Sequence, residues 1–273
     1  MKLFFLAFIS IFFFCQMVLA QNNSPKGFNI YQLPKITSYR LSEIKLKNLQ
    51  PKGTPFIAEK EILYYQQETH EFQIDYLAAE RLKKLHNKGC CHSFAVFIGN
   101  EAIYVGSFWK SNQSQSFDGM IINTYKSVGD PPYYSNTDFP ILTLELGYPS
   151  AEYFKQSDLR SDSRIFNALE TAGLLYNELE LTVKCKNIAA TGKRRASAIF
   201  TFEVVAVNKG EFDKKEITLE IFDGKLLSEL GAELKFGVGE NTKFNVNQEI
   251  ILNYSKQVGM TEPKLLFKSF RKK

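Results

Sequence analysis

The sequence is poor in the side chains that most catalytic and metal sites use. It has three histidines, four cysteines and one tryptophan among 273 residues. It also lacks a Gly-x-Ser-x-Gly elbow, a glycine-rich phosphate loop and a His-Glu-x-x-His helix, which are the motifs of serine hydrolases, nucleotide-binding enzymes and zinc proteases. We therefore expect a protein that is not an enzyme and that carries no cofactor.

The sequence carries slightly more positive than negative charge. The formal net charge is +5, and it becomes +4 if Lys2 is removed with an N-terminal segment. So small a charge on a chain of this length does not favour binding to nucleic acid. The hydrophobic content of 44% and the aromatic content of 14% predict well-packed cores rather than disorder.

The long apolar run of this chain lies at its N-terminus. Residues 3–14 are almost wholly apolar, follow Lys2, and are followed by Val18 and Ala20. This layout predicts a secretory signal over residues 1–20 with cleavage after Ala20, because the run is shorter than the ~20 residues of a membrane-spanning helix. We expect a protein exported to the periplasm or the extracellular space, with no membrane span after cleavage. Retention of the segment as an anchor and attachment of lipid at Cys15 are the open alternatives.

Two of the other cysteines lie close to two of the histidines in the sequence. His86, Cys90, Cys91 and His92 fall within seven residues, and Cys185 follows much later. Thiolate and imidazole groups are ligands for zinc or copper, and Cys185 could complete such a site or form a disulfide with Cys90 or Cys91. Against a metal site, adjacent residues on a strand point to opposite faces. A set of buried structural thiols is the other interpretation of the same residues.

The patterning predicts an α+β fold class, with a small α+β module followed by an all-β OB-like barrel or sandwich. Residues 21–55 are polar and contain four prolines, which indicates an extended arm or linker. We place the α+β module at residues 56–175 and the β-barrel module at residues 176–270.

Within these modules the periodicity identifies individual elements. Apolar residues alternate with polar ones in 70–76, take helical spacing in 77–85, and fill two strands at 93–98 and 102–108 that are joined at Gly99. The second module has five or six short strand-like segments separated by turns such as Asn208-Lys209-Gly210.

The first module resembles the periplasmic head subdomain of the SecDF preprotein translocase component. The resemblance rests on residues 61–62, on the strand and helix of 70–85, on the hairpin 94–103 with its Gly99-Asn100 tip, and on residues 119–122. It covers about a quarter of the chain and implies a small α+β binding module. The chain lacks the transmembrane helices of that family, so a motor or translocation activity does not carry over.

The second module resembles the OB-like, netrin-type barrels of exported bacterial proteins. The resemblance rests on the strand and Lys-Gly turn of residues 200–210 and on the returning strand 216–219. It implies a barrel architecture and says nothing about a ligand.

A polar loop around the single tryptophan is the candidate recognition surface. Trp109 and Lys110 follow a predicted strand, and Asn112 and Gln113 lie in the run after them. An aromatic anchor with hydrogen-bonding neighbours favours binding of a partner, unless Trp109 simply packs over the sheet.

We accordingly expect a non-enzymatic binding or adaptor protein of the cell envelope with a protein partner. The binding surface would lie near Trp109 or on the loops of the barrel. A thiol- or metal-binding protein using the cysteines and His92 is the alternative, and an accessory role in protein export would rest on fold analogy alone. The oligomeric state is left open.

Overall fold

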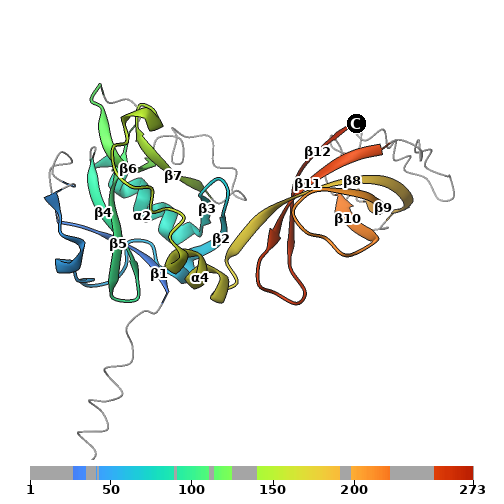
Figure 1. Ribbon diagram of the computed structural model, residues 1–273, viewed down its shortest axis with the longest axis horizontal. Helices are drawn as coiled ribbons and strands as arrows, with labels where there is room; N and C mark the ends of the chain where they lie inside the picture. The colour runs from blue at the N-terminus through green and yellow to red at the C-terminus, as the bar shows by residue number, and fades with distance from the viewer. Residues whose placement is uncertain are drawn as a thin grey trace, which may run out of the picture. The chain divides into compact units, whose positions relative to one another are not determined.

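The chain divides into two compact units, residues 1–175 and 176–273. The expected signal segment lies outside the residues that can be described. The computed structural model (Figure 1) describes residues 27–34, 41, 43–88, 91–110, 114–124, 140–190, 198–221 and 249–272.

Seven strands build the first unit. They lie in the order β1-β4-β5-β6-β7-β3-β2, and the pairs whose register is defined are antiparallel except β5 with β6, which are parallel. In chain order these strands are β1 (Phe28–Gln32), β2 (Ile62–Gln66), β3 (Glu71–Ile74), β4 (His92–Ile98), β5 (Glu101–Trp109), β6 (Phe117–Asn123) and β7 (Ile141–Tyr148).

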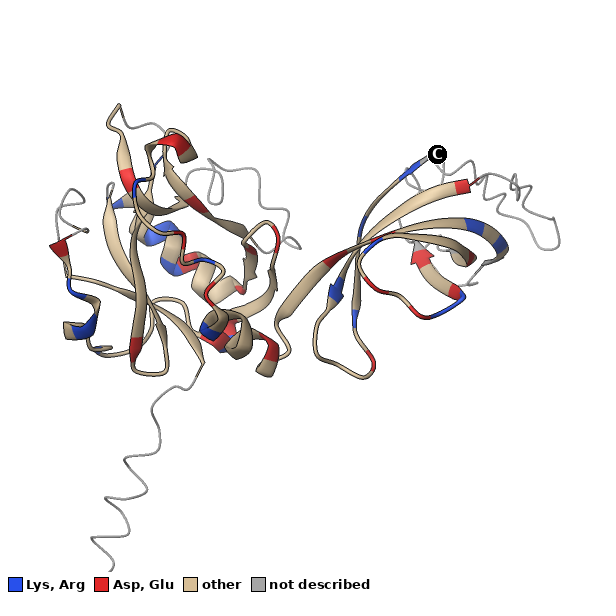
Figure 2. Cartoon of the chain, viewed as in Figure 1, with Lys and Arg blue, Asp and Glu red and all other residues tan. Residues whose placement is uncertain are grey.

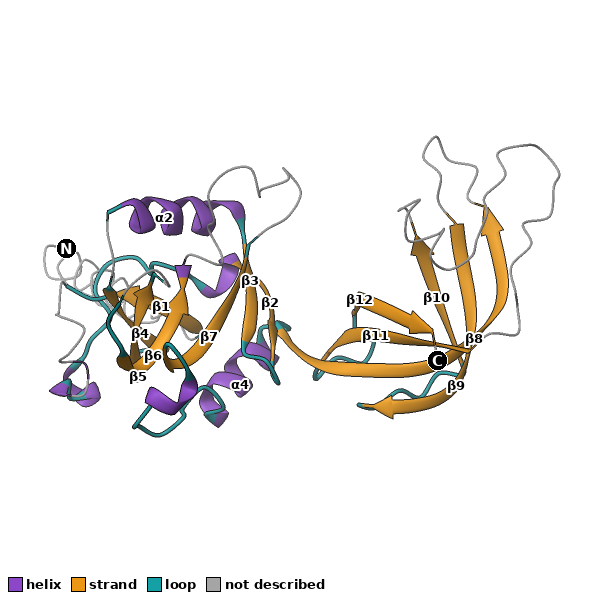
Figure 3. Cartoon of the chain, turned by 90° about the horizontal axis from the view of Figure 1, so that it is seen from above, coloured by secondary structure: helices purple, strands orange, loops and turns teal. Residues whose placement is uncertain are grey.

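Two α-helices accompany these strands and lie on opposite sides of them (Figure 3). Helix α2 (Tyr76–Asn87) begins where the Asp75 carboxylate accepts a hydrogen bond from the Ala78 amide, and its buried residues follow helical spacing. Helix α4 (Ser163–Thr171) begins at Asp162 in the same way and buries Ile165 and Leu169. Three short 3-10 turns complete the unit: η2 (Leu46–Asn48), η3 (Glu59–Glu61) and η4 (Ala151–Tyr153).

The stretch that reads as an arm contributes a strand to the core of this unit. Strand β1 pairs with β4 along its whole length, and its Phe28 and Ile30 are fully buried. Ile30 also forms a bridge to Ile57 on its other side. Residues 28–32 therefore have backbone partners on both edges. Burial of their apolar side chains stabilises a strand here, although the prolines of residues 21–55 predicted an extended arm.

The described residues of the second unit form five strands, in the order β10-β9-β8-β11-β12. All four pairs are antiparallel. Their inward residues form one hydrophobic core, which includes Leu181, Phe200 and Leu252. The strands are β8 (Leu175–Ala190), β9 (Ala198–Lys209), β10 (Glu216–Ile221), β11 (Glu249–Gln257) and β12 (Leu265–Lys272).

The expected fold class, a small α+β module followed by an OB-like barrel, is wrong. The protein is predominantly β, with twelve strands assigned to one mixed sheet and only two α-helices in the described part of the chain. Strands such as β1 and β2 are nearly all buried, so their sequences lack the two-residue alternation by which strands are recognised. In the second unit, β10 and β12 end the strand order, and among the described residues no pairing joins them into a barrel.

The expected hairpin of the first unit is confirmed. Strands β4 and β5 pair antiparallel, and Gly99 adopts a positive φ of 61° at the turn, a conformation that favours glycine. Neither α2 nor α4 has the length and hydrophobicity that a bilayer crossing requires, and no other described helix does.

Candidate functional site

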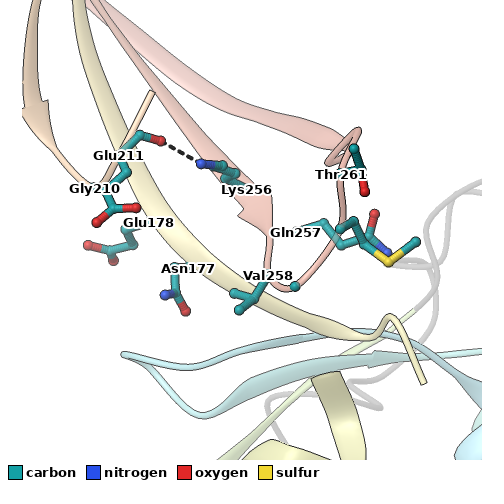
Figure 4. Close-up of a pocket in the computed structure, with 10 residues that line it drawn as sticks. Asn177, Glu178, Gly210, Glu211, Lys256, Gln257, Val258 and Thr261 are labelled. Atoms are coloured by element: carbon teal, nitrogen blue, oxygen red, sulfur yellow. Dashed lines mark hydrogen bonds between the residues drawn. The ribbon is translucent and has the colours of Figure 1, made fainter. Parts of the chain in front are cut away.

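The second unit contains a pocket of about 690 Å³ where three of its segments meet (Figure 4). This volume falls within the ~300–1,000 Å³ of small-molecule sites in proteins. The start of β8, the segment after β9 and the connection between β11 and β12 form its walls. The lining residues are Asn177, Glu178, Gly210, Glu211, Lys256, Gln257, Val258, Gly259, Met260 and Thr261.

Backbone pairing and one side-chain bond hold these walls together. Asn177 of β8 lies directly opposite Lys256 of β11 in the antiparallel register. The Lys256 Nζ atom donates a hydrogen bond of 2.7 Å to the carbonyl oxygen of Glu211, which is the dashed line in Figure 4. The turn after β9 is thereby tied to β11, so the pocket is formed by segments that are fixed to one another.

Two glycines shape the turns of the pocket. Gly210 has a φ of +79°, and a Cβ atom at this position would lie 2.7 Å from the carbonyl oxygen of Glu178. Gly259 has a φ of +73° in the connection between β11 and β12. A larger residue at Gly210 would have to push β8 away, so the close approach of turn and strand depends on this glycine.

The charged groups of the pocket are of both signs. The Glu178 carboxylate forms an ion pair with Lys209. The Glu211 carboxylate has no ion pair or hydrogen bond among the described contacts, and its residue is exposed. The pocket lining therefore contains one carboxylate, that of Glu211, without a counter-charge among the described contacts, and one ammonium group, that of Lys256.

Asn177 adds a polar group whose bonding is incomplete. Its Oδ1 atom is buried and has no hydrogen-bond partner. An unsatisfied buried acceptor costs about 1–3 kcal/mol, and a donor from a ligand or a water would recover that cost.

The lining residues combine charged, polar and apolar side chains. They include no histidine, cysteine or serine, so this lining has no Ser–His or Cys–His pair and no imidazole or thiolate ligand for zinc. Val258 and the half-exposed Met260 supply apolar contact beside the polar groups. The arrangement can bind a small molecule by hydrogen bonds and apolar contact.

The structure places Trp109 in the core of the first unit rather than on a surface. Only 1% of this residue is exposed, and its ring stacks on Phe117 at a centroid distance of 5.1 Å. Lys110 is half-buried, and Asn112 and Gln113 lie outside the described residues. The surface near Trp109 thus has no exposed indole to anchor a partner.

The histidines of the predicted cluster are engaged in local structure. His86 Nδ1 lies 3.0 Å from the Thr124 hydroxyl, which in turn donates to the carbonyl oxygen of Trp109. His92 is half-buried at the start of β4, in register with Phe108. Among the described residues no group of three or more histidine, cysteine and acidic side chains is arranged to hold a metal ion.

The cysteines are found in two different states. Cys91 is disulfide-bonded to a partner outside the described residues, and Cys90 is likewise outside them. Cys185 is a buried free thiol in the core of the second unit, so it forms no disulfide with Cys90 or Cys91. Burial raises the pKa of the Cys185 thiol, which disfavours the reactive thiolate.

A buried polar cluster in the first unit was not identified from the sequence. The Tyr65 hydroxyl lies 3.0 Å from His70 Nδ1, and the His70 ring stacks on Phe166. Burial and, to a lesser degree, the charge of Arg160 lower the pKa of His70. The hydrogen bond with Arg160 lowers the pKa of Asp158. Each of these groups has a partner, so the cluster serves the stability of this unit.

The pocket residues were also not identified beforehand, apart from one turn. The sequence signal was the Asn208-Lys209-Gly210 turn, which marks the position of Gly210 but not of the residues that it meets.

Searches of protein-family models, of curated proteins and of solved structures found no match to this chain.

Proposed function

We propose that this chain is an exported, non-enzymatic binding protein that holds a small polar ligand in the pocket of its second unit. The observation that carries the proposal is the 690 Å³ pocket between fixed segments, with residues that bear carboxylate, ammonium and amide groups in its lining. The expected signal at residues 1–20 supports export. The proposed site lies in the second unit, whose loops were one of the two places where the sequence predicts a binding surface.

The chemical groups of the lining residues indicate which kind of ligand the pocket would bind. Glu211 and Asn177 offer acceptors, Lys256 offers a donor, and Val258 and Met260 offer apolar contact. A molecule that carries both hydrogen-bond donors and a small apolar part matches this set. A purely apolar ligand would leave the charged groups desolvated without partners, which is unfavourable.

Native mass spectrometry of the protein purified from an exported fraction tests the proposal. We expect a bound small molecule on the wild-type chain and at least about tenfold weaker binding, equivalent to ~1.4 kcal/mol, in a Val258→Trp variant. The indole at position 258 would occupy the pocket.

Val205→Trp provides the matched control, because Val205 is an exposed residue of β9 that does not line the pocket. Equal occupancy in the two tryptophan variants would contradict the proposal. So would the absence of any bound molecule, combined with no thermal stabilisation by a library of small polar compounds.

A further inference from the structure

The outward face of α2 combines exposed apolar residues with lysines whose side chains contact no partner in the described part of the chain. Its buried residues, Ala78, Leu82 and Leu85, point to the core. At 100° per residue the opposite face carries Tyr76, Glu80, Lys83, Lys84 and Asn87, with Leu77 at its margin and Lys88 directly after the last helical residue. We call these seven residues the α2 outer face.

The apolar part of this face lies at the start of the helix. Tyr76 is 64% exposed and Leu77 is 63% exposed, which makes them the most exposed large hydrophobic residues of the described chain. They are adjacent in sequence and belong to the first turn. Isolated exposed apolar residues are common, whereas contiguous exposed apolar surface marks interaction sites; here the two neighbours form one apolar end of a face whose other end carries positive charge.

The charged part lies toward the end of the helix. The side chains of Lys83, Lys84 and Lys88 form no ion pair or hydrogen bond with any described residue. Glu80 is the acidic residue on this face, so the α2 outer face carries an excess of positive charge. Figure 2 shows the basic residues gathered along this helix.

We propose that the α2 outer face docks on a membrane surface that contains anionic lipid. A helix of 12 residues lying flat, about 18 Å long, would bring Tyr76 and Leu77 at one end and the lysines at the other into contact with the same plane. Lysines hold their ammonium groups at the level of anionic headgroups, and tyrosine rings favour the boundary between headgroups and acyl chains.

A membrane surface fits this face better than a protein partner does. A stable protein interface needs an apolar centre within roughly 800 Å² on each partner, whereas the apolar part here consists of two protruding side chains with charge beside them. The complementary charge comes from headgroups that can rearrange around each lysine. The proposal is independent of the pocket in the second unit.

Co-sedimentation with lipid vesicles tests the proposal on the full chain, processed by the cell that exports it. Vesicles of phosphatidylcholine alone are compared with vesicles of equal parts phosphatidylcholine and phosphatidylglycerol. We expect binding to the anionic vesicles only, with a loss at about 1 M salt because charge interactions are then screened.

Two sets of variants separate the contributions. Lys83→Gln, Lys84→Gln and Lys88→Gln together should weaken binding about a hundredfold, at about fivefold per lysine. The control is Lys45→Gln, Lys47→Gln and Lys52→Gln, which removes the same charge from exposed lysines elsewhere in the first unit. A Tyr76→Trp variant adds an optical test, because its emission should be quenched by vesicles with brominated acyl chains while buried Trp109 is not.

The contrary outcomes are equally definite. Equal binding to neutral and anionic vesicles, or equal weakening by both triple variants, would overturn the proposal. Absence of vesicle binding together with loss of a crosslinked acidic protein in the α2 variant would assign the face to a protein partner instead.

Discussion

At the scale of single residues, His70 links the stability of the first unit to pH. It is 7% exposed, and its Nδ1 atom lies 3.0 Å from the Tyr65 hydroxyl. The hydroxyl donates this hydrogen bond while Nδ1 carries no proton, and the ring donates it to the hydroxyl oxygen when Nδ1 is protonated. Burial and nearby Arg160 both lower the pKa of His70, while Asp158 and Glu68 oppose them.

The free energy of unfolding should therefore decrease as the pH falls below about 6.5. The pKa of His70 is lower in the folded protein than in the unfolded chain, so the unfolded chain takes up the proton first. Above about pH 6.5 this residue adds no pH dependence. In a His70→Asn variant we expect a loss of about 1 kcal/mol at neutral pH from the missing hydrogen bond and a weaker decrease toward about pH 5.

Urea denaturation at a series of pH values, followed by Trp109 fluorescence, measures both effects. Asparagine is chosen because it tolerates the positive φ of 54° at this position. If the variant kept the whole pH dependence of the wild type, the other titrating groups would be responsible. Asp158 acts in a more acidic window, because its pKa is lowered from 3.8.

At the scale of elements, the turn after β9 depends on a close backbone approach. Gly210 and Gly53 share a positive φ, +79° and +73°, but only at Gly210 would a Cβ atom meet other atoms. Two alanine substitutions can therefore separate backbone strain from steric overlap.

Gly53→Ala should cost about 1 kcal/mol, the strain of placing a Cβ atom at positive φ. Gly210→Ala should cost clearly more, because β8 must also move away from the turn. Thermal denaturation followed by circular dichroism compares the two, and equal losses would show that the approach to Glu178 is unimportant. A displaced turn would also weaken ligand binding in the pocket.

Several helices, strands and turns of this protein could be predicted from the sequence. The strands β4 and β5, most of the helix α2 and the turn at Gly99 follow from local signals, namely apolar periodicity and a Gly-Asn pair; the alternating pattern of residues 70–76 assigns Asp75 and Tyr76 to a strand, whereas they are the cap and the first residue of α2. The strands β8 to β12 were also anticipated as strands, with ends that differ by a few residues.

The rest depends on contacts between distant segments. Strand β1 is stabilised by pairing with β4, about 65 residues later in the chain, which no local pattern of Phe28–Gln32 reports. Residues 59–66 form η3 followed by the strand β2, whose near-complete burial removes the alternation of apolar and polar residues from its sequence. The pocket joins residues 177, 210 and 256, so its walls are visible only once the order β9-β8-β11 is known.

At the scale of the whole molecule, the two units have separate hydrophobic cores. Leu181 belongs to the core of the second unit, and Leu144 is fully buried in the first. Each leucine replaced by alanine should cost its own unit about 2–5 kcal/mol.

Tryptophan fluorescence should distinguish the two variants, because Trp109 lies in the first unit. Leu144→Ala should lower the denaturation midpoint seen by fluorescence. Leu181→Ala should leave that midpoint in place and lower a transition seen only by circular dichroism. Coincident shifts in both signals for both variants would instead mean that the units unfold as one.

Oxidation of the buried free thiol of Cys185 depends on how often the second unit opens. A free thiol in an oxidising compartment survives only while the surrounding sheet shields it. Each opening of the strands exposes the sulfur to oxidants for the duration of that opening. The rate at which this thiol is oxidised is therefore set by how often β8 separates from its neighbours, so the extent of oxidation in a sample of the protein reports how often the second unit opens.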